Sequence, residues 1–122
     1  MTKKIYTKIV GTGSHIPSEI VDNEYFLDTI FYEATGKKAE KPIEETIKKF
    51  HEITNIAERR WVNDDQVNSD IATIAAEGAL RSAGVDRESL DFIISCHNFG
   101  DVYQGNPRVD TLPAIANRVK KL

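Results

Sequence analysis

The sequence predicts an α/β fold in which a mainly parallel sheet is flanked by helices. Along its 122 residues, β-rich segments at residues 5–10 and 91–95 alternate with helical segments. The run over residues 91–95 is short and almost continuously apolar, as buried parallel strands are. Strands that alternate with helices are joined by right-handed crossovers and form parallel sheets. The chain is long enough for one domain with a hydrophobic core.

Glycine, proline and capping residues divide the first half of the chain. Residues 5–10 are predicted to form a strand that ends in a tight turn at Gly11–Gly13. Asp22–Asn23 can cap a helix that continues toward a stop signal at Gly36. A proline opens the next predicted helix, over residues 42–54, and two glutamates near its start suit the positive end of the helix dipole.

The second half contains the clearest helical pattern. A short strand is expected over residues 57–62, and the helix over residues 70–83 ends at a glycine. Asn68–Ser69 supplies the expected cap of that helix, and its many alanines imply close packing against a sheet or another helix. A long loop over residues 97–111 then leads to a last helix that begins near residues 112–113.

Composition excludes several classes of function. The formal net charge is −3 with interspersed charges, so no basic stripe for nucleic acid is present in the sequence. No apolar run reaches the roughly 20 residues that span a bilayer. Cys96 is the single cysteine, which excludes an internal disulfide and fits a reducing compartment. We therefore expect a cytoplasmic protein that binds neither nucleic acid nor a membrane.

Three local features could carry chemistry, and each has a structural alternative. Gly11–Ser14 could cradle a phosphate, but it lacks the third glycine of a dinucleotide fingerprint and the Gly-Lys-Ser/Thr of a P-loop, which favours a structural turn. Cys96 and His97 could form a nucleophilic pair, but neighbours on a strand point to opposite faces. A cysteine that is buried or lies at the base of a loop is therefore the default interpretation. The spacing of the histidines does not indicate a metal site.

The segment that ends at Trp61 is the third feature. Arg59 and Arg60 could hold a substrate phosphate or pair with Glu58 or another carboxylate, and pairing is favoured. Trp61 is expected in a core or an interface.

Several motifs in order resemble one enzyme family. Thr54, Ile56, Glu58 and Arg59 are similar to a Thr-Gly-Ile-x-Glu-Arg motif, and the rest of the match comprises Tyr6–Ser14, Asp70–Val85, Leu90–Ile94 and Pro113 with Ala116. Together they resemble β-ketoacyl-acyl-carrier-protein synthase III, a condensing enzyme of the thiolase superfamily. The resemblance implies that residues 1–122 are the N-terminal part of a thiolase-like condensing-enzyme domain.

The resemblance also implies a reaction and its participants. Such enzymes condense an acyl-CoA primer with malonyl-acyl-carrier protein, with loss of carbon dioxide, through a cysteine nucleophile and a His/Asn pair. All three groups are expected beyond Leu122, so this chain carries no catalytic residue and should be inactive alone. Thr54 is expected at the pantetheine entrance and Leu112 at an acyl pocket or dimer interface. No cofactor is implied, and the parent is expected to be a homodimer.

The sequence departs from the family pattern at identifiable positions. Asn55 replaces a glycine of the motif, Ile53 stands where many members have a CoA-contacting arginine, and Lys49 where a tryptophan commonly stacks on adenine. The segments 31–48 and 99–111 are longer than usual. A hydroxymethylglutaryl-CoA synthase-like enzyme, a non-enzymatic protein-interaction module and a small nucleotide-binding domain are the alternatives.

Overall fold

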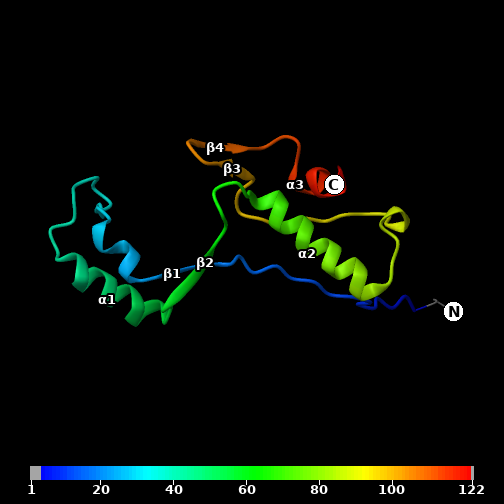
Figure 1. Ribbon diagram of the computed structural model, residues 1–122, viewed down its shortest axis with the longest axis horizontal. Helices are drawn as coiled ribbons and strands as arrows, with labels where there is room; N and C mark the ends of the chain where they lie inside the picture. The colour runs from blue at the N-terminus through cyan, green and yellow to red at the C-terminus, as the bar shows by residue number, and fades with distance from the viewer. Residues whose placement is uncertain (1–3, 122) are drawn as a thin grey trace. The chain divides into compact units, whose positions relative to one another are not determined.

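The computed structural model describes residues 4–121, and they fall into two compact units (Figure 1). The small unit is Ser18–Trp61. The large unit combines Met1–Pro17 with Val62–Leu122. Each unit is described by itself below.

The small unit is a strand pair followed by short helical elements. Strand β1 (Glu19–Asp22) pairs antiparallel with β2 (Glu58–Trp61), and Val21 of β1 is 4% exposed. Between the strands lie a 3-10 helix, η1 (Glu24–Asp28), and helix α1 (Ile43–Thr54). The strand predicted over residues 57–62 is therefore confirmed as β2.

The helix predicted to run toward Gly36 is wrong beyond its first turn. The carboxylate of Asp22 accepts hydrogen bonds from the backbone N–H groups of Glu24 and Tyr25, which starts η1 as the capping pattern predicts. The chain becomes extended at Thr29, where two β-branched residues in succession disfavour helix. Gly36 instead has a positive φ of 78° inside a turn.

Helix α1 has the predicted bounds. It begins after Pro42 and ends at Asn55, whose φ of 53° is left-handed and whose N–H donates to the carbonyl of His51. Asparagine and glycine are the residues that adopt this conformation at least cost. Asn55 therefore ends α1 in a left-handed conformation that a glycine at this position would also adopt without strain.

The large unit is built on helix α2 (Asn68–Ala83), which confirms the helix predicted over residues 70–83. A 3-10 turn, η2 (Arg87–Ser89), an antiparallel hairpin of β3 (Asp101–Tyr103) and β4 (Asn106–Asp110), and helix α3 (Ile115–Lys121) follow. The last helix is confirmed, whereas the hairpin occupies what the sequence predicts as a loop. Val67 and Ile115 are the buried apolar side chains of this unit among the described residues.

The ends of α2 are closed by different means. Gly84 has a φ of 64° and donates its N–H to the last turn, as predicted. At the start, the carboxylate of Asp70 accepts from the N–H of Val67 at 2.9 Å. The predicted caps Asn68 and Ser69 lie within the first turn, because their side chains bind Phe99 and Asp101 instead.

The parallel sheet is not found among residues 4–121, where both strand pairs are antiparallel. Residues 5–10 and 91–95 are extended but form no ladder. Their apolar side chains are open to solvent, with Ile5 at 94% and Phe92 at 86% exposure. A strand requires a neighbour that accepts and donates its backbone hydrogen bonds, and the described residues provide none here.

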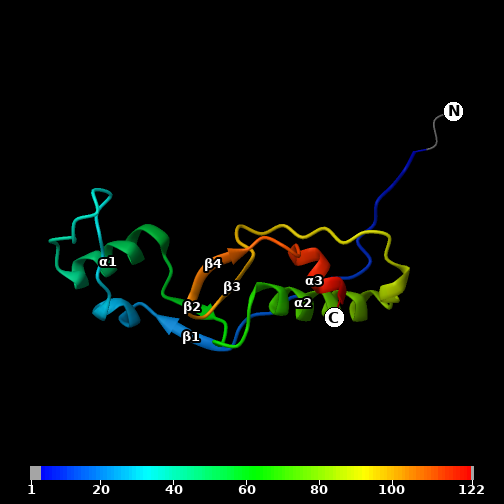
Figure 2. The ribbon, with the colours of Figure 1, turned by 90° about the horizontal axis from the view of Figure 1, so that it is seen from above.

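The predicted tight turn at Gly11–Gly13 is also wrong. Neither glycine has a positive φ, and the segment runs extended along α2 (Figures 1 and 2). A Cβ on Gly11 would lie 2.6 Å from the carbonyl oxygen of Ala79 and the nitrogen of Ala83. The glycines are there because the segment packs directly against the helix backbone. This confirms the close packing that the small residues of α2 predict.

Candidate functional site

The motif in the small unit is held by its own hydrogen bonds. The hydroxyl of Thr54 donates to the carbonyl of Phe50 at 2.7 Å and accepts from the N–H of Ile56 at 3.2 Å. Thr54 therefore joins the end of α1 to the segment that leads into β2. Thr54 is exposed.

The carbonyl of Ile56 is a second anchor of the motif. It accepts from the side-chain amide of Asn23 at 2.9 Å, and Nδ1 of His51 lies 3.1 Å from the same oxygen. The second contact is a hydrogen bond when Nδ1 carries the proton. These bonds connect the motif to the segment after β1 and to α1.

Arg59 contacts three groups of the small unit. Its guanidinium donates to the side chain of Asn23 at 2.8 Å and to the carbonyl of Asp22 at 3.3 Å, and it lies 4.8 Å from the ring centroid of Phe26. The expected pairing with a carboxylate is found for Arg60, which approaches Glu58 at 3.6 Å. Arg59 instead binds an amide oxygen and a backbone carbonyl oxygen.

Trp61 completes an aromatic cluster. Its ring meets that of Tyr25 edge-on at 4.9 Å and that of Phe26 at 6.3 Å. It keeps 37% of its surface exposed. The prediction that Trp61 packs rather than offers a free stacking platform agrees with these contacts.

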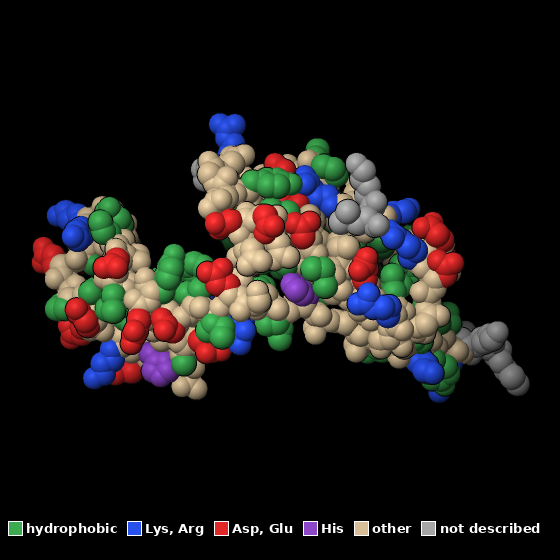
Figure 3. Space-filling model, in the orientation of Figure 1, with side chains coloured by type: hydrophobic (Ala, Val, Ile, Leu, Met, Phe, Trp, Pro, Cys, Tyr) green, Lys and Arg blue, Asp and Glu red, His purple; other side chains and the backbone are tan. Residues whose placement is uncertain are grey.

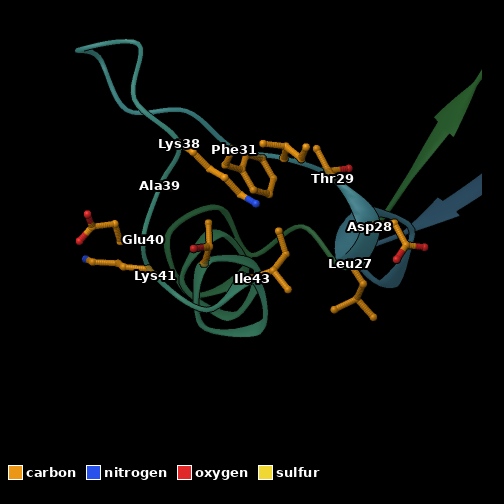
Figure 4. A pocket seen from close by; sticks show the side chains of 11 residues that line it. Leu27, Asp28, Thr29, Phe31, Lys38, Ala39, Glu40, Lys41 and Ile43 are labelled. Carbon is orange, nitrogen blue, oxygen red and sulfur yellow. The ribbon is translucent and has the colours of Figure 1, made fainter.

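A pocket of about 420 Å³ lies elsewhere in the small unit (Figure 4). Leu27, Phe31 and Ile43 give it apolar walls, and Lys38 and Lys41 give it cations. Most of the residues that line it lie in the stretch 31–48. The residues around it include no nucleophile paired with a base.

The large unit contains a buried charged cluster that the sequence reasoning missed. Asp101, at 0% exposure, accepts from the backbone N–H and from the hydroxyl of Ser69, each at 2.8 Å. Because Ser69 lies in the first turn of α2, the carboxylate also sits at the positive end of that helix. Arg118 of α3 completes the arrangement with an ion pair of 3.0 Å.

The guanidinium of Arg118 binds both the hairpin and the loop that follows it. Besides Asp101, it donates to the hydroxyl of Tyr103 at 3.1 Å and to the carboxylate of Asp110 at 3.1 Å. Desolvation by burial lowers the pKa of Arg118, but the hydrogen bond to Tyr103 and the charge of Asp101 outweigh it and leave that pKa above its ordinary value. The guanidinium is therefore a permanent cation.

One signal could have found this cluster. Arg118 follows Ile115 by three residues in a predicted helix, which places a charge on the same side as the buried Ile115. A charge at such a position needs a buried partner. The partner, Asp101, was hidden in a segment predicted to be a loop.

Leu112 lies in the loop between β4 and α3. Its side chain is 82% exposed, whereas its carbonyl oxygen accepts from Arg118 at 3.5 Å. Thr54 belongs to the small unit and Leu112 to the large unit, so the structure places each predicted binding residue in its own unit.

Cys96 is exposed, so the expectation of a buried cysteine is wrong, whereas a cysteine at the base of the following loop stays a prediction. The physical reason is the extended segment before it, which has no neighbouring strands to cover it. His97 is exposed as well. Over residues 4–121, no group of three His, Cys, Asp or Glu side chains is arranged to hold a metal ion, and no helix is long and apolar enough to cross a membrane.

Comparison with known proteins gives one consistent name. The chain is 34% identical over 116 residues to β-ketoacyl-acyl-carrier-protein synthase III of Staphylococcus aureus strain JH1, across 93% of the chain and 29% of that protein. It is 33% identical over 94 residues to the synthase III of Xanthomonas euvesicatoria, across 77% of the chain and 25% of that protein. The synthase III of Xanthomonas campestris is 32% identical over the same length. No protein-family model matches the chain.

The chain thus spans about a quarter of the length of the relatives it matches. The resemblance carried by the Thr54–Arg59 motif and its flanking segments is confirmed by these relatives. Over most of its length, this chain is a homologue of part of the β-ketoacyl-acyl-carrier-protein synthase III proteins.

Proposed function

We propose that residues 1–122 are the N-terminal part of a thiolase-like domain in a synthase III-type acyltransferase. The parent performs decarboxylative Claisen condensation of an acyl thioester with malonyl-carrier protein, in fatty-acid or related biosynthesis. The observation that carries this proposal is the 34% identity to a synthase III over 93% of the chain. The parent acts in the cytoplasm as a homodimer, with acyl-CoA and acyl-carrier protein as its partners.

Within this proposal, the chain supplies residues that bind the substrate and line its pocket, and it supplies no catalytic group. Thr54, fixed at the end of α1, stands at the pantetheine entrance, and Leu112 contributes to the acyl pocket. The cysteine nucleophile and the His/Asn pair belong to the remainder of the parent. The extended segments 5–10 and 91–95 become strands of a mainly parallel sheet when that remainder pairs with them.

The chain alone is therefore expected to form no acyl-enzyme. Incubating the purified 122-residue chain with acetyl-CoA and longer acyl-CoAs should leave its intact mass unchanged. The Cys96→Ala variant shows whether any adduct is carried by the exposed thiol. An acyl adduct that forms on the chain and disappears in Cys96→Ala would overturn the assignment of the nucleophile to the remainder.

The gene downstream of Leu122 gives the second test. A cysteine at a helix start within about two turns, followed by a distant histidine and asparagine, supports the condensing enzyme. The exposed Phe92 and Ile94 favour one other function, a module that binds a protein partner through this apolar segment. A stop codon soon after Leu122 would favour that module and contradict the enzyme.

A further inference from the structure

We propose that Arg118 is a positioning residue that fixes the backbone of the loop carrying Leu112, and through it the place of the Leu112 side chain. This inference rests on the proposed function, which assigns Leu112 to the acyl pocket. Arg118 touches neither substrate nor reacting atoms. Its effect on the reaction is to set which acyl chains the pocket accepts.

The first argument is the number of donors. A guanidinium carries five N–H groups, and five acceptors surround this one. Three belong to side chains of the hairpin, namely Asp101, Tyr103 and Asp110. Two are loop carbonyls, that of Pro113 at 3.0 Å from Nε and that of Leu112 at 3.5 Å from Nη2. Every donor of Arg118 is thus matched, and two of the five hold the loop.

The second argument is the rigidity of the support. Arg118 has a side-chain exposure of 19%, and its partner Asp101 is fully buried. Asp101 is in turn bound twice by Ser69 in the first turn of α2. Contacts therefore run without a break from α2 to the carbonyl of Leu112. A site held by such a second layer of contacts is defined more sharply than a free loop.

The third argument is the contrast at Leu112 itself. Its carbonyl oxygen is hydrogen-bonded to Arg118, whereas its side chain is exposed to solvent, with Leu112 at 82% exposure. A fixed backbone with a free apolar side chain suits a residue that meets a ligand or a partner. A loop with a mobile backbone would present the same side chain with less defined geometry.

The Arg118→Lys variant tests the hydrogen-bond geometry of Arg118 while keeping its positive charge. Lysine keeps the cation but has three donors and no planar fork, so it cannot serve the carboxylates and both loop carbonyls together. Arg81→Lys is the matched control, because Arg81 is exposed on α2 and its guanidinium forms an exposed ion pair with Glu77, at 4.0 Å. Asp110→Ala is a milder variant that removes one partner of Arg118 at a half-exposed position.

The first experiment measures the loop directly in the 122-residue chain. In ¹⁵N relaxation, the order parameter of the Leu112 amide should fall from about 0.85 in the wild type to below about 0.6 in Arg118→Lys. It should stay unchanged in Arg81→Lys. An unchanged value in Arg118→Lys overturns the proposal. If Arg118→Lys does not fold, Asp110→Ala decides instead. A lower order parameter of the Leu112 amide in Asp110→Ala supports the proposal, and an unchanged one overturns it.

The second experiment measures selectivity in the full-length gene product. The ratio of kcat/KM for a short and a long acyl-CoA should change about 10-fold in Arg118→Lys, as it does in Leu112→Ala. The double variant should change the ratio no further, because both act through one side chain. Equal losses for both primers would show a purely structural role and overturn the inference. If the wild-type product condenses no primer, the proposed function fails, whereas the order parameter still reports on Arg118.

Discussion

Two arginines in this chain illustrate how one side chain can organise a whole unit. Arg59 in the small unit and Arg118 in the large unit each bind groups that are far apart in the sequence, such as Asn23 with Arg59 and Asp101 with Arg118. Arg60 and Arg87 form ion pairs at more exposed positions. Exposed ion pairs contribute little to stability. The burial and geometry of its contacts therefore decide how much each arginine contributes to the stability of its unit.

Asp101→Ala should cost about 3 kcal/mol of unfolding free energy, because it leaves the charge of Arg118 without its buried partner. Urea unfolding followed by circular dichroism measures the change. Asp65→Ala, at an exposed turn position, is the control and should unfold like the wild type. If Asp101→Ala does not fold, Asp101→Asn takes its place. Midpoints equal to that of the control would contradict the assigned role.

Arg59→Lys should lower the unfolding free energy by about 1 kcal/mol, because the variant cannot bind Asn23 and the backbone of Asp22 together while covering Phe26. Arg60→Lys is the adjacent control and should have no measurable effect. Fluorescence of Trp61, the single tryptophan, reports unfolding of the small unit directly. A larger effect in Arg60→Lys than in Arg59→Lys would refute this ranking.

At the scale of elements, the N-terminal segment approaches α2 closely at a contact that has a glycine on each side. A Cβ on Gly13 would overlap the backbone of Ala75 and Ala79, whereas a Cβ on Gly78 would meet the Cα of Gly13 at an ordinary 3.5 Å. The two glycines face the same contact from opposite sides. Substituting each of them by alanine should therefore change the free energy of unfolding in opposite directions.

Gly13→Ala should destabilise the large unit by about 1–3 kcal/mol, since the segment must move away from the helix. Gly78→Ala should stabilise α2 by about 0.5–1 kcal/mol, because glycine is a poor residue in a helix interior. Thermal unfolding at a helix-sensitive wavelength compares both with the wild type. Two variants that shift the midpoint in the same direction would disprove the packing argument.

Helices α1 and α2 were predictable from sequence because their signals are local. The bounds of α1 and α2 follow from Pro42, Asn55 and Gly84, and their hydrogen bonds join residues four apart. Residues 5–10 and 91–95 have strand patterns of equal clarity, but a strand also needs a partner that the pattern cannot supply. The Asp101–Arg118 cluster was missed for the same reason, since its members meet only through tertiary structure.

The whole molecule exposes more surface than a folded chain of its length usually does. Its accessible surface is 10,567 Å². A single compact domain of this size exposes about 6,600 Å², and two separate globules of the size of the two units would expose about 7,900 Å². The excess does not depend on how the units are placed. On the face drawn in Figure 3, hydrophobic side chains stand uncovered among charged ones.

This exposure includes large apolar side chains in a row. Phe92 and Ile94, at 86% and 87% exposure, alternate along one extended segment, and a cavity of about 940 Å³ opens beside it between α2 and α3. An extended apolar segment with unpaired backbone groups is a template for another chain. In the proposed parent, the remaining three quarters of the protein would cover it.

The purified 122-residue chain should therefore self-associate, with a light-scattering mass that rises above 13.7 kDa as its concentration increases. Phe92→Asp should shift the mass back toward that of a single chain, because a charge opposes burial of the segment in a second copy. Asn98→Asp adds the same charge at a nearby exposed polar position and should leave the association intact. A clean monomer at every concentration would show that the exposed segment finds no partner in a second copy, and would count against its role as an unpaired strand.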